Sequence, residues 1–102
     1  MPKKLSEEQL DALIEEATVD CYDDYEARAG FFTVLEDNLT FPFKATVIGE
    51  EVEVIGIEQE DERIDAVCKR KRKKYQVDIL NLKYKSEEVK GYEWIEAYRK
   101  WV

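Results

Sequence analysis

The sequence contains no histidine and only two cysteines, Cys21 and Cys68, which lie far apart along the chain. Without histidine, neither an imidazole-based zinc site nor a histidine-based catalytic triad has its usual groups. Two distant cysteines do not form a close pair of metal ligands either. We therefore expect both cysteines to be small, buried, apolar residues with free thiols.

Long apolar runs are absent as well. No stretch approaches the ~20 apolar residues that a membrane-spanning helix needs, and none has the character of a signal peptide. There are only 4 glycines and 2 prolines, and no internal repeats or low-complexity linkers. The 102 residues, of which 44% are hydrophobic, predict one globular domain over residues 1–102. We expect this domain to be a cytoplasmic monomer without a membrane partner.

Basic residues are scarce in the first two thirds of the chain. Residues 1–66 hold 5 basic and 19 acidic side chains, whereas residues 67–102 hold 11 basic and 5 acidic ones. The net charge of −8 is therefore unevenly distributed, and the acidic part is expected to concentrate cations and repel nucleic acid. The alternative interpretation is that the acidity only keeps the protein soluble.

Helical periodicity dominates the first part of the sequence. In LSEEQLDALIEEA the apolar residues recur at helical spacing, which predicts a helix over about 7–17 with Ser6 and Gln9 as its capping box. A second helix is predicted over about 20–37, although Gly30 weakens its middle. The residues expected to line one side of this second helix are Tyr22, Tyr25, Ala29 and Phe32, with Leu35 beside them.

The periodicity changes to that of strands after residue 44. Val52 and Val54 alternate with glutamates, and Gly49 and Gly56 are expected at bends or bulges. Residues 64–69 and 75–79 predict two further strands, which are joined across a basic run. Short strands with tight turns suggest a small curled antiparallel sheet or barrel.

An amphipathic pattern then predicts a C-terminal helix over about 86–102, with Ser86 as its cap. The predicted fold class is α+β, with a helical part over about 5–40, a small antiparallel β-barrel over about 44–82 and this final helix.

The acidic residues form four groups, namely Asp20, Asp23, Asp24, Glu26; Glu36, Asp37; Glu50, Glu51, Glu53; and Glu58, Glu60, Asp61, Glu62, Asp65. Carboxylate oxygens without nitrogen or thiolate partners suit hard cations, and Ca²⁺ above all. An EF-hand is excluded, because the acids in DCYDDYEARAG do not alternate and the glycine comes too late. Any calcium site must therefore be assembled from separate segments.

The stretch VLEDNLTFPF places Glu36 and Asp37 near the expected end of a helix, before Pro42. A helix C-terminus has about four unpaired carbonyls and roughly half a negative charge, so two carboxylates there conflict with it electrostatically. A bound cation would relieve the conflict by collecting both carboxylates, carbonyl oxygens and the Asn38 amide oxygen. The alternative is that both acids are solvated and that Asn38 is a plain C-cap.

At these residues the sequence resembles the calcium-binding proteins of the CcbP type, first described in cyanobacteria. The resemblance rests on VDCYDDYEARAGFFTVLEDNLTFPFKA, residues 19–45, and on the GEEVEVIGI that follows. The matching positions are Asp20, Tyr22, Glu26, Gly30, Phe31, Leu35, Glu36, Asp37, Leu39, Phe41, Pro42, Phe43 and residues 51–54. The match is good over about residues 19–57 and looser in the C-terminal third.

The resemblance implies a small intracellular calcium-binding protein whose N-terminal helices pack on an SH3-like barrel. It makes Asp37 the first expected ligand, with Glu36 beside it. Asp20 and Glu26 also match family positions. The full set of expected calcium ligands is Asp37, Glu36, Asp20, Asp23, Asp24, Glu26, Glu50 and Glu51.

The other members of this set are included for reasons that do not depend on the resemblance. Asp23 and Asp24 are included because of their charge alone. Glu50 and Glu51 are included on the condition that the loop before their strand packs near the second helix.

The basic run KRKRKK departs from the resemblance. It consists of Lys69, Arg70, Lys71, Arg72, Lys73 and Lys74. Six cations at a hairpin suggest an alternative function, a nucleic-acid or phosphate-binding module in which Tyr75 stacks on a base. The run also fits a solvated hairpin tip that guards a sheet edge, or a surface that meets acidic groups of the same or another molecule.

Calcium binding without catalysis, as a buffer or a sensor, is the leading hypothesis. Paired carboxylates can in principle act as acid and base. However, the sequence has no nucleophile with a base, no phosphate-binding loop and no cofactor motif, so we do not expect an enzyme. A nucleic-acid partner is also not expected, because of the acidic charge.

Overall fold

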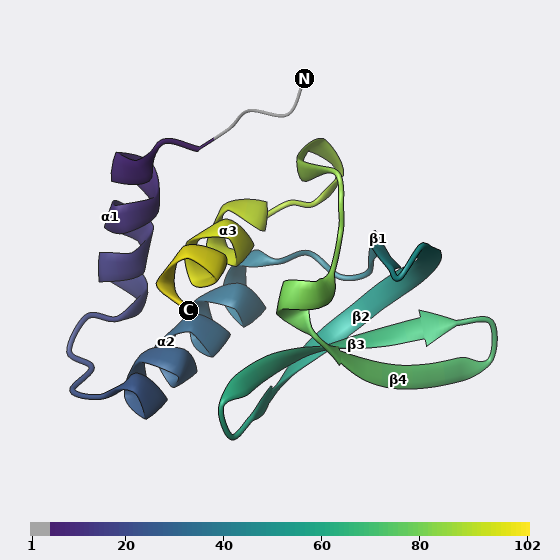
Figure 1. Cartoon of the computed structure of the whole chain (residues 1–102), viewed down its shortest axis with the longest axis horizontal. Helices are drawn as coiled ribbons and strands as arrows, with labels where there is room; N and C mark the ends of the chain where they lie inside the picture. Colours follow the sequence, from purple (N-terminus) through teal and green to yellow (C-terminus); the bar gives the residue numbers. More distant parts are fainter. Residues whose placement is uncertain (1–4) are drawn as a thin grey trace.

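The computed structural model describes residues 5–102 (Figure 1). Its helices are α1 (Glu7–Ala17), α2 (Asp24–Asn38) and α3 (Tyr92–Trp101); its strands are β1 (Phe43–Val47), β2 (Glu50–Glu60), β3 (Arg63–Arg70) and β4 (Lys73–Asp78); and two 3₁₀ turns are η1 (Ile79–Asn81) and η2 (Ser86–Glu88). The α+β class is confirmed. The domain predicted over residues 1–102 includes residues 1–4, which lie outside the described residues.

Helix α1 has the bounds and the cap that the sequence predicts. The Ser6 hydroxyl accepts a hydrogen bond from the Gln9 backbone N–H at 3.1 Å, and the Gln9 side chain accepts one from the Ser6 N–H at 2.9 Å. These reciprocal bonds satisfy two N–H groups that a helix N-terminus leaves free. The helix packs on α3 and α2.

Helix α2 begins later than predicted, because Asp23 is its N-cap. Asp20 lies outside the helix at φ 62, a left-handed conformation that aspartate tolerates better than most residues. The buried stripe of α2 consists of Ala27, Phe31 and Leu35.

The two tyrosines that were predicted to line one side of this helix do not belong to its buried stripe. Tyr22 precedes the helix and is 90% exposed, and Tyr25 in the first turn is 65% exposed. Gly30 does not break the helix, which runs unbroken through it.

The four strands form an antiparallel sheet in the order β1-β2-β3-β4, joined by two-residue turns. Val52 and Val54 face the core while Glu51 and Glu53 are exposed, as predicted. Gly49 has φ 77 in the β1–β2 turn, and the register shifts between Val54 and Gly56, so both glycines lie at the expected irregularities.

The sheet is open, and the expected SH3-like barrel is not confirmed. Among the described strands β1 and β4 do not pair with each other. After β4 the chain passes through η1 and returns to β1, where Lys83 forms a single antiparallel bridge with Thr46. The two backbone bonds of this bridge measure 2.7 and 2.9 Å. One bridge covers part of the β1 edge without adding a strand.

The C-terminal helix starts at Tyr92, and Ser86 is not its cap. Ser86 belongs to η2, whereas the N-cap of α3 is Gly91 at φ 92. A Cβ atom on Gly91 would lie 2.4 Å from the Asn38 carbonyl oxygen, so this position requires glycine for space as well as for conformation.

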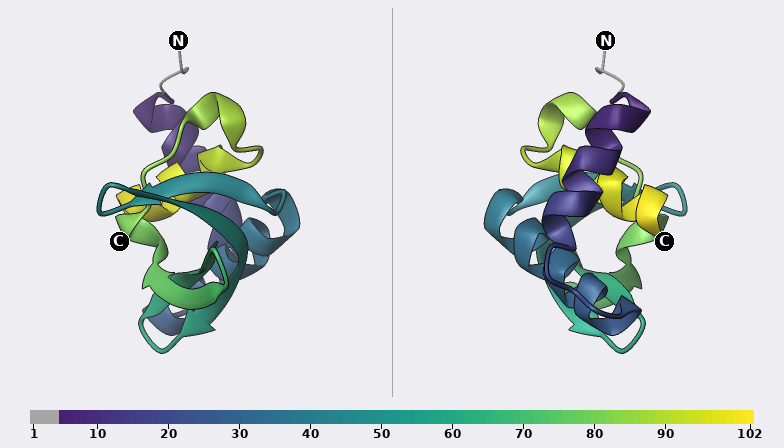
Figure 2. Two further views of the ribbon diagram at one scale, coloured as in Figure 1. Left: turned by 90° about the vertical axis from the view of Figure 1, so that its right-hand side faces the viewer. Right: turned by 90° about the vertical axis from the view of Figure 1, so that its left-hand side faces the viewer.

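The core lies between the helices and one face of the sheet. Phe31 of α2 and Tyr98 of α3 meet edge to face at 5.4 Å, next to buried strand residues such as Val54 and Ile64. Figure 1 shows α1 on the left, the sheet on the right, and α2 and α3 between them, and in Figure 2 the sheet faces the viewer in the left view and α1 in the right view. No helix within residues 5–102 is long and apolar enough to cross a bilayer.

Candidate metal site

Four of the expected ligands lie at the N-terminus of α2, where two of them hold the backbone. Asp23 Oδ1 accepts a hydrogen bond from the Glu26 N–H at 2.8 Å, and Glu26 Oε2 accepts one from the Tyr22 N–H at 2.9 Å. Both residues are exposed, and only one oxygen of each carboxylate accepts these bonds. Asp20 and Asp24 are also exposed. These acids therefore share one end of the molecule, with two of them fixed in place.

The β2–β3 turn faces this end of α2. Asp24 lines a surface hollow of about 350 Å³ together with Asp61 and Glu62 of the turn, and the cationic Arg28 of α2 lines it as well. Tyr25 lines the same hollow and a second one beside it, which contains Glu60. The turn and the helix thus bring carboxylates from distant parts of the sequence to a common surface.

Sequence reasoning did not include these turn acids among the ligands. The signal was present, because Glu60, Asp61 and Glu62 form a compact acidic group. Their position opposite α2 depends on the hairpin register, which pairs Glu60 with Arg63 and leaves a two-residue turn.

Glu36 and Asp37 lie in the last turn of α2, and both are exposed. The Asn38 amide nitrogen donates to the Val34 carbonyl at 2.7 Å, so this side chain is bonded one turn back within α2. The C-cap itself is Leu39, whose N–H donates to the Leu35 carbonyl. The conflict between two carboxylates and the helix C-terminus is therefore real in the structure.

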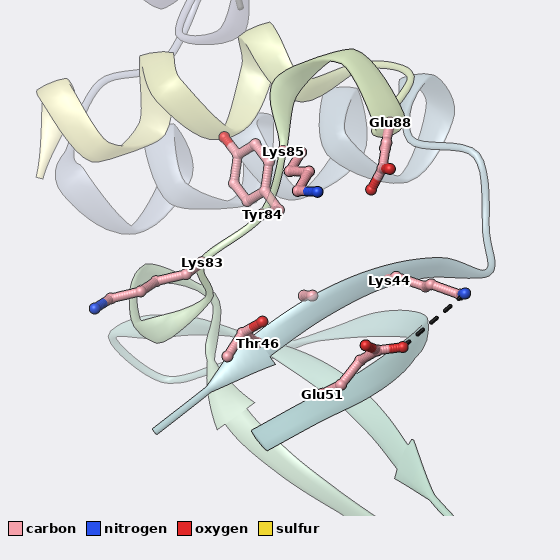
Figure 3. Close-up of a pocket in the computed structure, with 8 residues that line it drawn as sticks. Lys44, Thr46, Glu51, Lys83, Tyr84, Lys85 and Glu88 are labelled. Atoms are coloured by element: carbon pink, nitrogen blue, oxygen red, sulfur yellow. Dashed lines mark ion pairs between the residues drawn. The ribbon is translucent and has the colours of Figure 1, made fainter. Parts of the chain in front are cut away.

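Glu50 and Glu51 lie at the β1–β2 turn, far from α2 in Figure 1, so the condition for including them is not met. Each has a cationic partner. Glu50 accepts a 3.1 Å bond from Arg70. Glu51 lies 4.0 Å from the ammonium of Lys44, the ion pair drawn as a dashed line in Figure 3.

The acidic residues differ in whether they form an ion pair with a basic side chain. The carboxylates of the described chain that form ion pairs are Asp11, Glu50, Glu51, Asp65 and Glu96. Asp65 is only 2% exposed, and its hydrogen bond to Arg63 raises the pKa of that guanidinium. Six of the eight expected ligands, all of them on or next to α2, form no ion pair in the described chain.

The two unpaired groups lie at opposite ends of one helix. With a rise of 1.5 Å per residue, Asp24 and Asp37 are separated by about 20 Å. Within residues 5–102, no three cysteine or carboxylate side chains already converge on one point as metal ligands would. The donors that each end offers are nevertheless all oxygens, which fits a hard cation such as Ca²⁺.

The basic run forms the β3–β4 hairpin. Lys69 and Arg70 end β3, Lys73 and Lys74 begin β4, and the two residues between them make the turn. Arg70 pairs with Glu50 of the neighbouring turn, so the run meets an acidic group of the same molecule.

The cysteines differ from the expectation in one respect. Both are free thiols, and Cys68 is buried, which raises its pKa. Cys21 is only half-buried, next to the acidic N-terminus of α2.

These features define a class of protein: a small α+β protein with unpaired carboxylates at both ends of a central helix. The chain matches the model of the CcbP calcium-binding family over residues 11–102, and it belongs to this family. No curated protein sequence matches it significantly.

Two solved structures share its fold. The crystal structure of Anabaena CcbP superposes with a TM-score of 0.75 at 22% identity, covering 99% of this chain and 94% of that one. A calcium-binding protein in its calcium-binding form superposes with a TM-score of 0.72 at 22% identity, covering 93% and 90%. Neither comparison supports the nucleic-acid alternative.

Proposed function

We propose that this protein binds calcium ions without catalysis, as a buffer or a sensor, and that the two ends of α2 provide the ligands. The proposal rests on one observation, namely that some of the expected ligands form ion pairs with basic side chains and the others do not. Glu50 and Glu51 form ion pairs with Arg70 and Lys44, whereas the acids at α2 form none in the described chain. Membership of a calcium-binding family identifies the ion that would neutralise them.

The C-terminal end of α2 is the first proposed locus, with Asp37 and Glu36 as ligands. The helix dipole adds negative potential there, and carbonyls at the helix end are available as further oxygen ligands. Ca²⁺ accepts six to eight oxygens in flexible geometry, so water can complete the coordination. A cation at this end is favoured by the backbone as well as by the side chains.

The N-terminal end is the second proposed locus, where Asp24, Asp61 and Glu62 line one hollow. Arg28 lines this hollow too, and its positive charge lowers the affinity for a cation. Asp23 and Glu26 would contribute their remaining oxygens, which the capping bonds hold in position. The helix dipole opposes a cation here. We therefore assign the tighter site to the C-terminal end.

Calorimetric titration with Ca²⁺, and with Mg²⁺ as a comparison, tests the proposal. The wild type is expected to show saturable binding, because calcium tolerates irregular clusters of oxygens better than magnesium does. Asp37→Asn keeps the size of the side chain and removes one charge, and should weaken the tighter site on the order of tenfold.

Glu50→Gln with Glu51→Gln is the matched control, since it removes two acids that already have cationic partners. This variant should bind calcium like the wild type. If it lost binding while Asp37→Asn kept it, the site would lie at the β1–β2 turn instead. Absence of saturable heat in the wild type at millimolar Ca²⁺ would reject calcium binding altogether.

The proposal keeps three expectations from the sequence. The protein would act in the cytoplasm, as a monomer and without an enzymatic activity. The single bridge between Lys83 and Thr46 supports an SH3-like course of the chain, in which the segment after η1 returns to the edge of β1.

A further inference from the structure

A groove of about 870 Å³ lies between the β1–β2 turn and the β3–β4 hairpin. Both hairpin ends appear on the right-hand side of Figure 1, away from the acidic ends of α2. Its apolar wall consists of Val47, Ile48, Tyr75 and Val77, and its rim consists of Glu50 and the four cationic residues 70–73. The groove therefore combines an apolar surface with a concentrated positive charge.

Ile48 is the most unusual residue of this groove. It is 96% exposed and has φ 49, a conformation in which a β-branched residue is strained. The following residue, Gly49, also has positive φ, so this two-residue turn is of the kind in which asparagine is the common first residue. An exposed, strained isoleucine in the wall of a groove indicates contact with a ligand.

The cations of the rim are largely free. Arg70 pairs with Glu50, but Lys71, Arg72 and Lys73 form no ion pair with any carboxylate of residues 5–102. The molecule as a whole carries a charge of −8, so this patch opposes the overall sign. Its complementary ligand is acidic.

The edge of β4 is available beside the groove. β4 pairs with β3 on one side only, and in the described chain no backbone hydrogen bond joins β4 to any other segment. An extended peptide can pair with such an edge through its own backbone. Lysines along an edge disfavour pairing with a second basic edge of the same kind, which favours an acidic strand over another copy of β4.

We propose that this groove binds an acidic peptide segment in an extended conformation. Its backbone pairs with the edge of β4, alternate apolar side chains contact Ile48 and Tyr75, and its carboxylates meet residues 71–73. Nucleic acid has no peptide backbone that could pair with a strand edge, and a flat membrane surface does not enter a groove. The peptide is therefore the occupant that uses all three features.

Selection from a phage-displayed library of random nine-residue peptides tests this, with the whole protein immobilised in calcium-free buffer. The enriched peptides are expected to contain Asp or Glu together with apolar residues at alternate positions. Synthetic versions are then measured by fluorescence anisotropy. In ¹H–¹⁵N spectra they should shift the resonances of β4 and the β3–β4 turn, and they should slow hydrogen exchange of the β4 amides that do not pair with β3.

Two variants locate the site, and a third is the matched control. Lys71→Gln with Arg72→Gln and Lys73→Gln should reduce affinity at least tenfold. Ile48→Asn removes the apolar contact in a turn that favours asparagine, so loss of affinity in this variant does not reflect misfolding. Lys83→Gln with Lys85→Gln and Lys90→Gln removes three exposed cations elsewhere and should keep the affinity.

Other outcomes overturn the proposal. These are enrichment of no peptide motif, or peptides that bind the triple rim variant as well as the wild type. Binding of a 12-nucleotide single strand or of phosphatidylserine vesicles at the rim, with no peptide bound, would assign the groove to those ligands. A concentration-dependent dimer in sedimentation equilibrium that the rim variant abolishes, again without peptide binding, would assign it to a second copy.

Discussion

At the scale of single residues, Gly30 shows how a weak helix former serves the packing of two helices. The sequence predicts only that Gly30 weakens α2. In the structure a Cβ atom at this position would lie 2.2 Å from the Ala17 carbonyl oxygen at the end of α1. Glycine therefore allows the end of α1 to approach the middle of α2 closely.

Gly30→Ala is accordingly expected to destabilise the protein, although alanine has the higher helix propensity. The blocking atom belongs to the backbone, so relief requires α1 to move, at a cost of about 1–3 kcal/mol. Urea denaturation measures this change in the free energy of unfolding. Gly56→Ala is the control, because a Cβ atom there meets nothing within 4 Å, and its free energy of unfolding should change far less. Equal effects at both glycines would contradict the close approach.

Tyr84 holds the segment after η1 against α3. Its hydroxyl donates to the Glu96 carboxylate, and the Arg99 guanidinium lies 5.4 Å from the centre of its ring. Burial and then the hydrogen bond to Glu96 raise the pKa of Tyr84 far above its ordinary value near 10. The folded state therefore keeps this tyrosine protonated at pH values where the unfolded chain ionises.

The stabilisation from Tyr84 is complete below the unfolded pKa of about 10 and is lost as the pH rises above it. This loss is at most about 1.4 kcal/mol for each pH unit, because partial exposure of Tyr84 to water reduces it. In urea denaturation between pH 10 and 12, Tyr84→Phe should lose stability less steeply than the wild type by this amount. Tyr22→Phe, at a residue that is 90% exposed, should keep the wild-type slope. Parallel slopes for all three proteins would show that Tyr84 ionises freely.

At the scale of elements, the N-terminus of α2 depends on a cap that also belongs to the acidic surface. Asp23→Ala removes the acceptor of the Glu26 N–H and should cost about 1 kcal/mol in calcium-free buffer. Asp20→Asn removes the same charge from a residue that accepts no capping bond, and asparagine tolerates the positive φ of this position, so it should cost less. Helix content followed by circular dichroism during urea denaturation compares the two variants. A larger loss for Asp20→Asn would mean that charge, not capping, decides.

The elements that the sequence predicted correctly are those with local signals. The capping box of Ser6 and Gln9 defines the start of α1, and alternation defines the core-facing valines of β2. The start of α3 depends instead on the fit of Gly91 against Asn38, a contact between distant segments. Such a contact leaves no local pattern, so Ser86 was the better cap on sequence grounds alone.

The candidate site likewise has some features that the sequence shows locally and others that depend on contacts between distant segments. The acids themselves are visible in the sequence, and so is the conflict of Glu36 and Asp37 with a helix end. Strand register and the position of two neighbouring turns decide which carboxylates form ion pairs, as for Glu50 and Arg70. The position of Asp61 opposite Asp24 also needs the fold.

At the scale of the whole molecule, opposite charges occupy different regions. The acids that we propose for calcium flank α2, and the basic rim surrounds the groove at the far end of the sheet. Neutralising the acidic end with Ca²⁺ reduces the repulsion that an acidic peptide meets as it approaches the groove. The two proposed sites are thus coupled through the field of the molecule, weakly and more so at low salt.

The double variant Glu36→Gln with Asp37→Asn distinguishes the destabilisation that these acids cause without calcium from the stabilisation that they provide by binding it. Without calcium it should be more stable than the wild type, by about 0.3–1 kcal/mol for each charge, because it removes the conflict with the helix C-terminus. With calcium the order should reverse. At a free Ca²⁺ concentration of 100 Kd the wild type gains about 2.7 kcal/mol, which raises the melting temperature of a domain of this size by roughly 10 °C or more.

Melting curves in EDTA and in CaCl₂ measure both effects, with NaCl added to equalise the ionic strength. Glu50→Gln with Glu51→Gln is again the control. It should show no gain in EDTA, because its acids are paired with Arg70 and Lys44, and it should keep the full calcium-dependent rise. If the double variant at the end of α2 melted below the wild type in EDTA, its carboxylates would be stabilising groups of the fold. A bound cation would then not be needed to explain their presence at a helix C-terminus.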